Sequence, residues 1–179
     1  MRDNQTFNLG EIPQNGRLGN YRKECTEIIE SQDTQKLQEF MWNLFSDCKN
    51  YLEEKFSLKF PNMELVIIYK REEYLDLLKT LDTALGVKPY TKAVCLVSNG
   101  MSWIYIDFVS HFKGEPIDFI ANLSVSFIEE LIHSASYPNK SETDVHELVC
   151  SAIEDFLEIK LPDAVREERL KYAQKFDNC

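Results

Sequence analysis

The pair Asn99-Gly100 constrains the fold more than any other feature of this 179-residue sequence. Apolar segments flank the pair on both sides, at 92–98 (KAVCLVS) and 101–109 (MSWIYIDFV). Because Asn and Gly both tolerate positive φ, they are typical of the two-residue turn of a β-hairpin. The sequence therefore predicts two antiparallel strands, which argues against an all-helical bundle.

The segments around this hairpin show helical or strand-like hydrophobic patterns. Residues 33–56 repeat apolar side chains at helical spacing, and 71–81 and 116–136 predict two further helices. Residues 63–70 (MELVIIYK) form a short apolar run of strand length, and 141–160 predict a last core helix that begins with a capping box. This order of elements predicts an α+β fold.

The chain divides into three predicted parts. Residues 1–20 contain glycine, proline and asparagine without a hydrophobic period, so we expect a flexible N-terminal arm. Residues 21–162 form a single α+β domain, and 163–179 form a charged C-terminal helix or tail at the periphery.

Charge limits the partners of this protein. Twenty Lys and Arg face thirty Asp and Glu, which gives a formal net charge of −10. The chain lacks the basic face of a nucleic-acid binder, a polybasic membrane-binding stretch and the ~20 consecutive apolar residues of a membrane-spanning helix. The five cysteines are scattered and the start of the chain does not resemble a signal peptide. We therefore expect a cytoplasmic protein that binds neither nucleic acid nor membranes.

Two glutamate–histidine pairs fall on the consecutive helices 116–136 and 141–160. Glu129 and His133 share the polar stripe of the first helix at i, i+4 spacing. Glu142 and His146, again at i, i+4, lie on the inward side of the second. If a short turn folds the helices against each other, the four side chains converge, and carboxylate and imidazole are ligands of zinc and other divalent ions.

Each pair also has a simpler interpretation. Glu129 and His133 can belong to a solvated helix face. Glu142 can be a first-turn acid that complements the helix dipole, and His146 a hydrogen-bonded core histidine. The coincidence of both pairs on facing helices favours the metal site.

The segment 127–135 (FIEELIHSA) resembles the active helix of the zincin metallopeptidases, whose HExxH motif reads EELIH here at 129–133. The segment 140–157 is similar to the second helix of the gluzincin branch, which supplies a glutamate as third zinc ligand. The resemblance implies a zincin-like fold: a small antiparallel or mixed sheet with backing helices, then a motif helix and a second ligand helix. It also implies that strand 101–109 is an edge strand.

Carried over residue by residue, the resemblance implies that Glu130 is the general base, and that His133 and Glu142 are zinc ligands. Glu129 replaces the first motif histidine, and His146 can supply a second imidazole. Two carboxylates with one imidazole would weaken the Lewis acidity of the ion compared with the usual set. The implied activity is that of a zinc-dependent hydrolase acting on peptides or proteins, which would pair with strand 101–109.

Two alternatives stay open. In the first, the altered motif has lost turnover and the chain is a zincin-like scaffold that acts as a binding or regulatory protein, with or without a structural ion. In the second, Glu130 and His133 form the ExxH of a di-iron bundle. The hairpin and the lack of a second ExxH count against the di-iron bundle.

Overall fold

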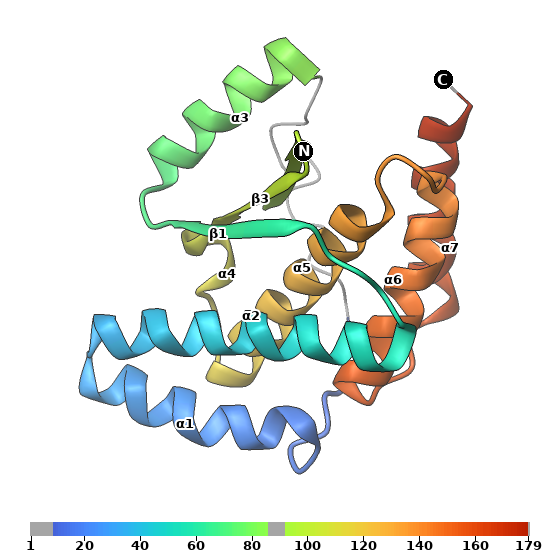
Figure 1. Cartoon of the computed structure of the whole chain (residues 1–179). Coiled ribbons are helices and arrows are strands. Elements are labelled where there is room, and N and C mark those ends of the chain that lie inside the picture. Colours follow the sequence, from blue (N-terminus) through green and yellow to red (C-terminus); the bar gives the residue numbers. More distant parts are fainter. Residues whose placement is uncertain (1–8, 86–91, 179) are drawn as a thin grey trace.

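The computed structural model describes residues 9–85 and 92–178, and it has a mixed α+β architecture (Figure 1). The elements, in chain order, are α1 (Arg17–Ser31), α2 (Thr34–Phe56), β1 (Asn62–Ile68), α3 (Arg71–Leu85), β2 (Ala93–Ser98), β3 (Met101–Asp107), α4 (Phe108–His111), α5 (Pro116–Ser136), α6 (Glu142–Leu157) and α7 (Asp163–Asp177). The predicted α+β class is confirmed.

The three strands form one mixed sheet in the order β1-β3-β2. Strands β2 and β3 are antiparallel, and the turn between them has positive φ at Asn99 (51°) and Gly100 (76°). The hairpin predicted from the Asn-Gly pair is therefore confirmed. Strand β1 joins β3 in parallel, so that Leu65 lies opposite Ile104.

Strand β3 is the central strand, so the prediction that 101–109 forms an edge strand is wrong. Strand β1 pairs with β3 along the whole length from Asn62 to Ile68. The side of β3 that the hairpin leaves open is thereby filled by a strand from earlier in the chain, which buries Leu65 against Ile104. The edges of this sheet are β1 and β2.

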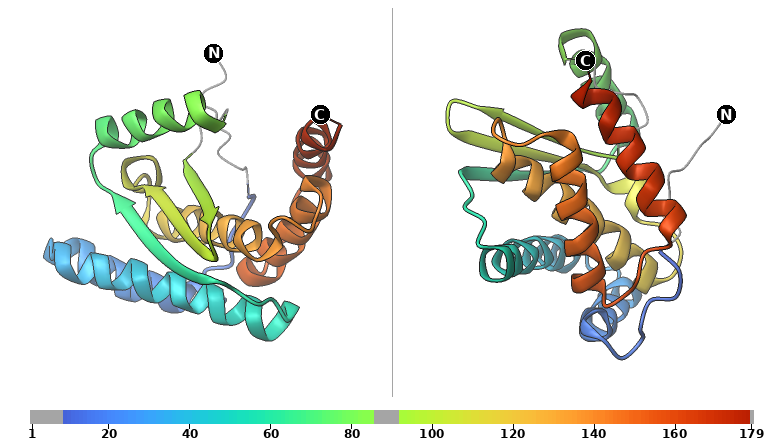
Figure 2. Two further views of the ribbon diagram at one scale, coloured as in Figure 1. Left: turned by 45° about the horizontal axis from the view of Figure 1, so that its top comes forward. Right: turned by 90° about the vertical axis from the view of Figure 1, so that its right-hand side faces the viewer.

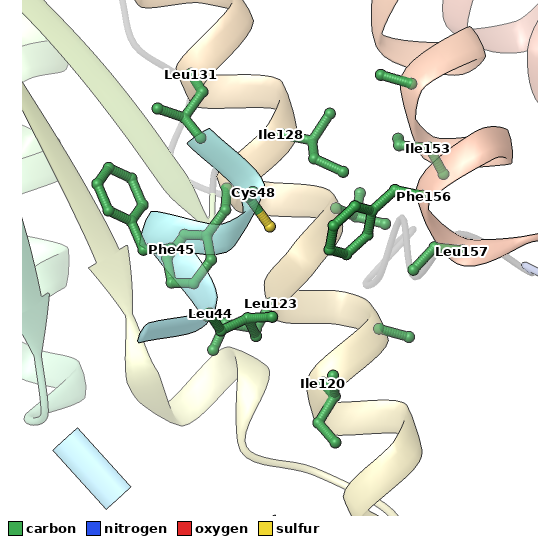
Figure 3. Packing of buried hydrophobic residues seen from close by; sticks show 14 of the residues in the cluster. Leu44, Phe45, Cys48, Ile120, Leu123, Ile128, Leu131, Ile153, Phe156 and Leu157 are labelled. Atoms are coloured by element: carbon green, nitrogen blue, oxygen red, sulfur yellow. The ribbon is translucent and has the colours of Figure 1, made fainter. Parts of the chain in front are cut away.

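Helices cover both faces of the sheet. Figure 1 shows α3 on one side and α5 with α2 on the other, and the two views of Figure 2 agree. Helix α5 packs against β2, α1, α2 and α6. Figure 3 shows the resulting core, in which Cys48 of α2, Ile128 of α5 and Phe156 of α6 approach one another. Helix α5 is thus the central helix of the fold.

Local sequence explains how α5 and α6 begin. Pro116 occupies the first turn of α5, where no amide donor is needed, and Glu115 with Asp118 forms a capping box. The Ser141 side chain accepts a hydrogen bond of 3.1 Å from the Asp144 amide and caps α6. The connection 137–140 is short, so α6 folds back along α5.

Helix α1 begins at Arg17, within the segment 1–20 that the sequence predicts as an arm. Residues 1–8 of that segment lie outside the described residues. Arg17 attaches α1 to the end of α6, because its Nη1 donates to the Phe156 carbonyl at 2.9 Å and its amide donates to Glu158 at 3.0 Å.

The charged C-terminal segment forms α7 and packs along α6. Arg169 and Ala173 are buried in this contact, so α7 is more closely integrated than the predicted periphery. Among the described residues, no helix is both long enough and apolar enough to cross a membrane.

Candidate metal centre

Three side chains from α5 and α6 meet around one carboxylate oxygen. The Oε2 atom of Glu142 lies 3.3 Å from His133 Nε2 and 3.3 Å from His146 Nε2. The two imidazole rings are 5.5 Å apart between centroids and nearly perpendicular. One ligand atom from each of the three residues lies within 4.8 Å of the others. The turn 137–140 brings Glu142 to His133, whereas the i, i+4 spacing on α6 brings it to His146.

The separations of Glu142 Oε2 from the two Nε2 atoms match those of a four-coordinate zinc site. With bonds of 2.0–2.2 Å, the corners of a tetrahedron are separated by roughly 3.3–3.6 Å. Two imidazoles and one carboxylate are also a ligand set that zinc accepts in proteins. His133 is oriented for this role, because its Nδ1 donates to the Glu129 carbonyl at 3.0 Å and leaves Nε2 toward Glu142. The residues present therefore fit a zinc ion in type and spacing.

Glu129 takes a different partner. Its Oε2 accepts a hydrogen bond of 3.0 Å from Nη2 of Arg169, a side chain of α7 that is only 6% exposed. Nη1 of Arg169 lies 3.1 Å from Nδ1 of His146. Burial is the largest single influence and would raise the pKa of Glu129, but the charges of Arg169, His133 and His146, together with the hydrogen bond from Arg169, outweigh it and the pKa is lowered. Glu129 is therefore an ionised partner of Arg169 and lies outside the His133–Glu142–His146 group.

Glu130 lies beside this group, on the side of the sheet. It forms a second set of close ligand atoms with Glu129 and His133, and it accepts a hydrogen bond from the Cys95 backbone of β2. Burial raises the pKa of Glu130 to about 7, against the opposing effect of the His133 charge. A carboxyl group with this pKa can both accept and release a proton near neutral pH.

The His133–Glu142 contact is strongly charge-assisted. Burial would lower the pKa of His133, but the hydrogen bond to Glu142 and the nearby carboxylates raise it to about 9. The same hydrogen bond, together with that from His146, lowers the pKa of Glu142 well below its usual range. At neutral pH and without an ion, His133 is consequently cationic and Glu142 anionic.

Arg169 is the site residue that the sequence did not predict. Segment 163–179 is rich in charge, and the sequence indicates a peripheral helix there. The sequence does contain a signal for a buried Arg169, because Val165, Arg169 and Ala173 follow each other at intervals of four along one helix face. In the structure Arg169 and Ala173 are buried. A charged residue on the apolar stripe of a helix needs a buried partner, here Glu129.

The third histidine has a structural role elsewhere. His111 lies in α4, and its ring is hydrogen-bonded to the Asp107 carbonyl through Nδ1 and to the Ser126 hydroxyl through Nε2, both at 2.7 Å. Burial, helped by the charges of Lys92 and Lys113, lowers its pKa to about 3. His111 is therefore neutral and belongs to the packing of α4 on α5.

Comparison with known proteins does not identify a family for this chain. No protein-family model, curated protein or solved structure matches the chain. The resemblance to the zincin metallopeptidases accordingly depends on the motif residues of α5 and α6.

Proposed function

We propose that this protein is a zinc-dependent hydrolase of peptides or proteins with an altered zincin-like motif. One observation carries the proposal: Nε2 of His133 and Nε2 of His146 both lie 3.3 Å from Oε2 of Glu142. These are the separations expected of ligands around one tetrahedral zinc ion. In this proposal His133, Glu142 and His146 hold the ion, and Glu129 positions Arg169.

Zinc, when bound, supplies Lewis acidity that activates water and polarises a carbonyl group. Glu130 then acts as the general base, because its raised pKa suits proton transfer near neutral pH. The backbone amide of Cys95 orients the Glu130 carboxylate, and the Glu129 carbonyl orients the His133 ring. The chain's own residues thereby provide a proton acceptor beside the ligand group.

An extended peptide would pair with β2, since β3 is central. Strand β2 is an edge of the sheet, and α5 packs against it. Its Cys95 backbone already contacts Glu130, so this edge is next to the proposed base. Edge strands bind extended peptides through main-chain hydrogen bonds.

A second candidate function is a non-catalytic scaffold, which the ion pair of Arg169 with Glu129 favours. His133 and Arg169 supply two positive charges, and Glu129 and Glu142 supply two negative ones. This group is charge-balanced without a metal ion. A chain that has lost catalysis can retain such a network for structural reasons.

Zinc affinity tests the proposed function. Protein purified without chelators or a polyhistidine tag is titrated with Zn²⁺ against a chromophoric chelator. We expect one zinc ion per chain, and a loss of affinity in His133→Ala and Glu142→Ala that exceeds the roughly 10–100-fold cost of losing an outer partner. Glu147→Ala is the matched control, because it removes an exposed carboxylate from the same helix. Failure to bind zinc, in the wild-type protein and in an Arg169→Gln variant alike, would contradict the proposal.

Glu130→Gln separates hydrolase from scaffold. Glutamine keeps the shape of Glu130 but cannot accept a proton, so zinc affinity should be nearly unchanged while peptide cleavage falls by about 100-fold or more. Cleavage is measured on a mixture of unstructured peptides by mass spectrometry. Zinc binding without cleavage in the wild-type protein would favour the scaffold.

A further inference from the structure

Arg169 connects α7 to both helices of the metal centre. Its side chain donates to Glu129 of α5 at 3.0 Å, and its other terminal nitrogen lies 3.1 Å from Nδ1 of His146 on α6. The end of α7 is also attached to α6, because the Asp177 carboxylate accepts hydrogen bonds from the amides of Glu142 (2.7 Å) and Thr143 (2.9 Å). Helix α7 thus contacts two proposed ligands, His146 through Arg169 and Glu142 through Asp177.

The contact with Arg169 determines which nitrogen of His146 carries the proton. A guanidinium group has donors and no acceptor, so Nδ1 of His146 must be the acceptor. The proton of the neutral ring is then on Nε2, which lies 3.3 Å from Glu142 Oε2. A histidine binds a metal ion through the nitrogen that lacks a proton. In this arrangement His146 directs a proton toward the ion position.

His133 also has its Nε2 toward Glu142, but the partner of its Nδ1 is an acceptor. Its Nδ1 donates to the backbone carbonyl of Glu129, and a carbonyl can only accept. Loss of the proton on Nε2 therefore leaves a lone pair toward Glu142, as metal binding requires. The two neutral rings would therefore carry their protons on different nitrogens. The difference arises because Arg169 of α7 donates to Nδ1 of His146.

We propose that α7 is an inhibitory latch of the metal centre, in which Arg169 competes with the ion for His146. This inference depends on the proposed metal site. With Arg169 in place, an ion has His133 and Glu142 as ligands; when Arg169 moves away, the His146 proton can shift to Nδ1 and Nε2 becomes the third ligand. Because coupling between two binding events is reciprocal, the ion in turn weakens the docking of α7.

Substitutions of Arg169 test the latch. In Arg169→Gln the amide oxygen can accept from Nδ1–H of His146, whereas Arg169→Lys remains a cationic donor without an acceptor. We expect Zn²⁺ affinity to rise about tenfold or more in Arg169→Gln and to change less than about threefold in Arg169→Lys. Arg166→Gln is the matched control, since it removes a positive charge from α7 that pairs with Glu154 at 2.8 Å.

The outcomes distinguish the latch from the metal site. If wild type and Arg169→Gln bind zinc equally well, the latch is refuted and the metal site stands. If neither binds zinc, both are refuted. If Arg169→Gln binds zinc and the wild-type protein does not, the latch is supported in its strongest form.

Two measurements on the wild-type protein keep the test valid if Arg169→Gln does not fold. Nitrogen-15 NMR of the zinc-free protein should find the His146 proton on Nε2, and a proton on Nδ1 would refute the latch. Hydrogen exchange of α7 amides should become faster when Zn²⁺ is added, while exchange in α2 stays the same. Slower or unchanged exchange in α7 would also refute it.

Discussion

Glu130 differs from Glu129 and Glu142 because burial has a larger effect on its pKa than the charge of the nearby His133. Arg169 neutralises Glu129, and the two histidines hydrogen-bond to Glu142. Burial therefore determines the protonation of Glu130 and raises its pKa to about 7. Among the acids of a chain with net charge −10, this one can change its proton occupancy near neutral pH.

His111 gives the protein a stability that depends on pH. In the folded chain its pKa is about 3, whereas an unfolded histidine titrates near 6.5. Between these values the unfolded state binds one proton more than the folded state, so stability is lost as the pH falls below about 6.5. The slope from this single group is about 1.4 kcal/mol per pH unit.

A comparison with His111→Gln measures this contribution. Glutamine does not titrate, so the difference in free energy of unfolding between wild type and variant should shrink as the pH falls from 7 to about 4.5. Urea unfolding at several pH values gives the two free energies. A difference that stays constant over this range would show that His111 is not buried as a neutral ring.

Elements with a local signal were predictable, and the pairing of distant elements was not. Asn99-Gly100 identified the hairpin, and helical spacing with Pro116 and Ser141 identified α5 and α6. The sequence does not show which strand of the hairpin pairs with β1, because the free edge of β2 and the free edge of β3 can both accept a further strand. Central placement of β3 is therefore a result of tertiary packing.

The cap of α6 can be tested at the level of the element. Ser141→Ala removes the hydrogen bond to the Asp144 amide and should lower the free energy of unfolding by about 1 kcal/mol. Ser151→Ala is the control: this exposed serine lies on the same helix and its hydroxyl donates to the Glu147 carbonyl. Its effect should stay within about 0.5 kcal/mol in urea denaturation. Equal effects of the two substitutions would contradict the capping role of Ser141.

The stability of the whole molecule depends on α5, because the sheet and helices α1, α2 and α6 all pack against it. Phe127 of this helix is completely buried and packs edge-to-face on Phe45 of α2, with 5.2 Å between ring centroids. Phe127→Ala should cost about 3–5 kcal/mol in free energy of unfolding, because the cavity cannot collapse between two helices. Phe176→Ala removes a phenylalanine that is 47% exposed and should cost much less. Chemical denaturation of both variants checks the difference, and similar losses would contradict the central position of α5.

The candidate site, like the elements of the fold, was predictable only where the signal in the sequence is local. Glu129, His133, Glu142 and His146 lie at i, i+4 spacing on two helices joined by a short turn, so their proximity follows from local geometry. Arg169 comes from a third helix, and its contact with Glu129 spans 40 positions in the chain. No local pattern specifies that pairing, although the buried stripe of α7 indicates that Arg169 needs a partner.

The position of β3 between a near and a distant partner has a consequence for the order of folding. A hairpin such as β2–β3 can form within about 1–10 μs, since only a two-residue turn must close. Strand β1 is separated from β3 by residues 69–100, so its pairing must overcome the larger entropy of closing a long loop. We therefore expect the hairpin to form first and to serve as the template on which β1 adds, so that the sheet is completed late in folding.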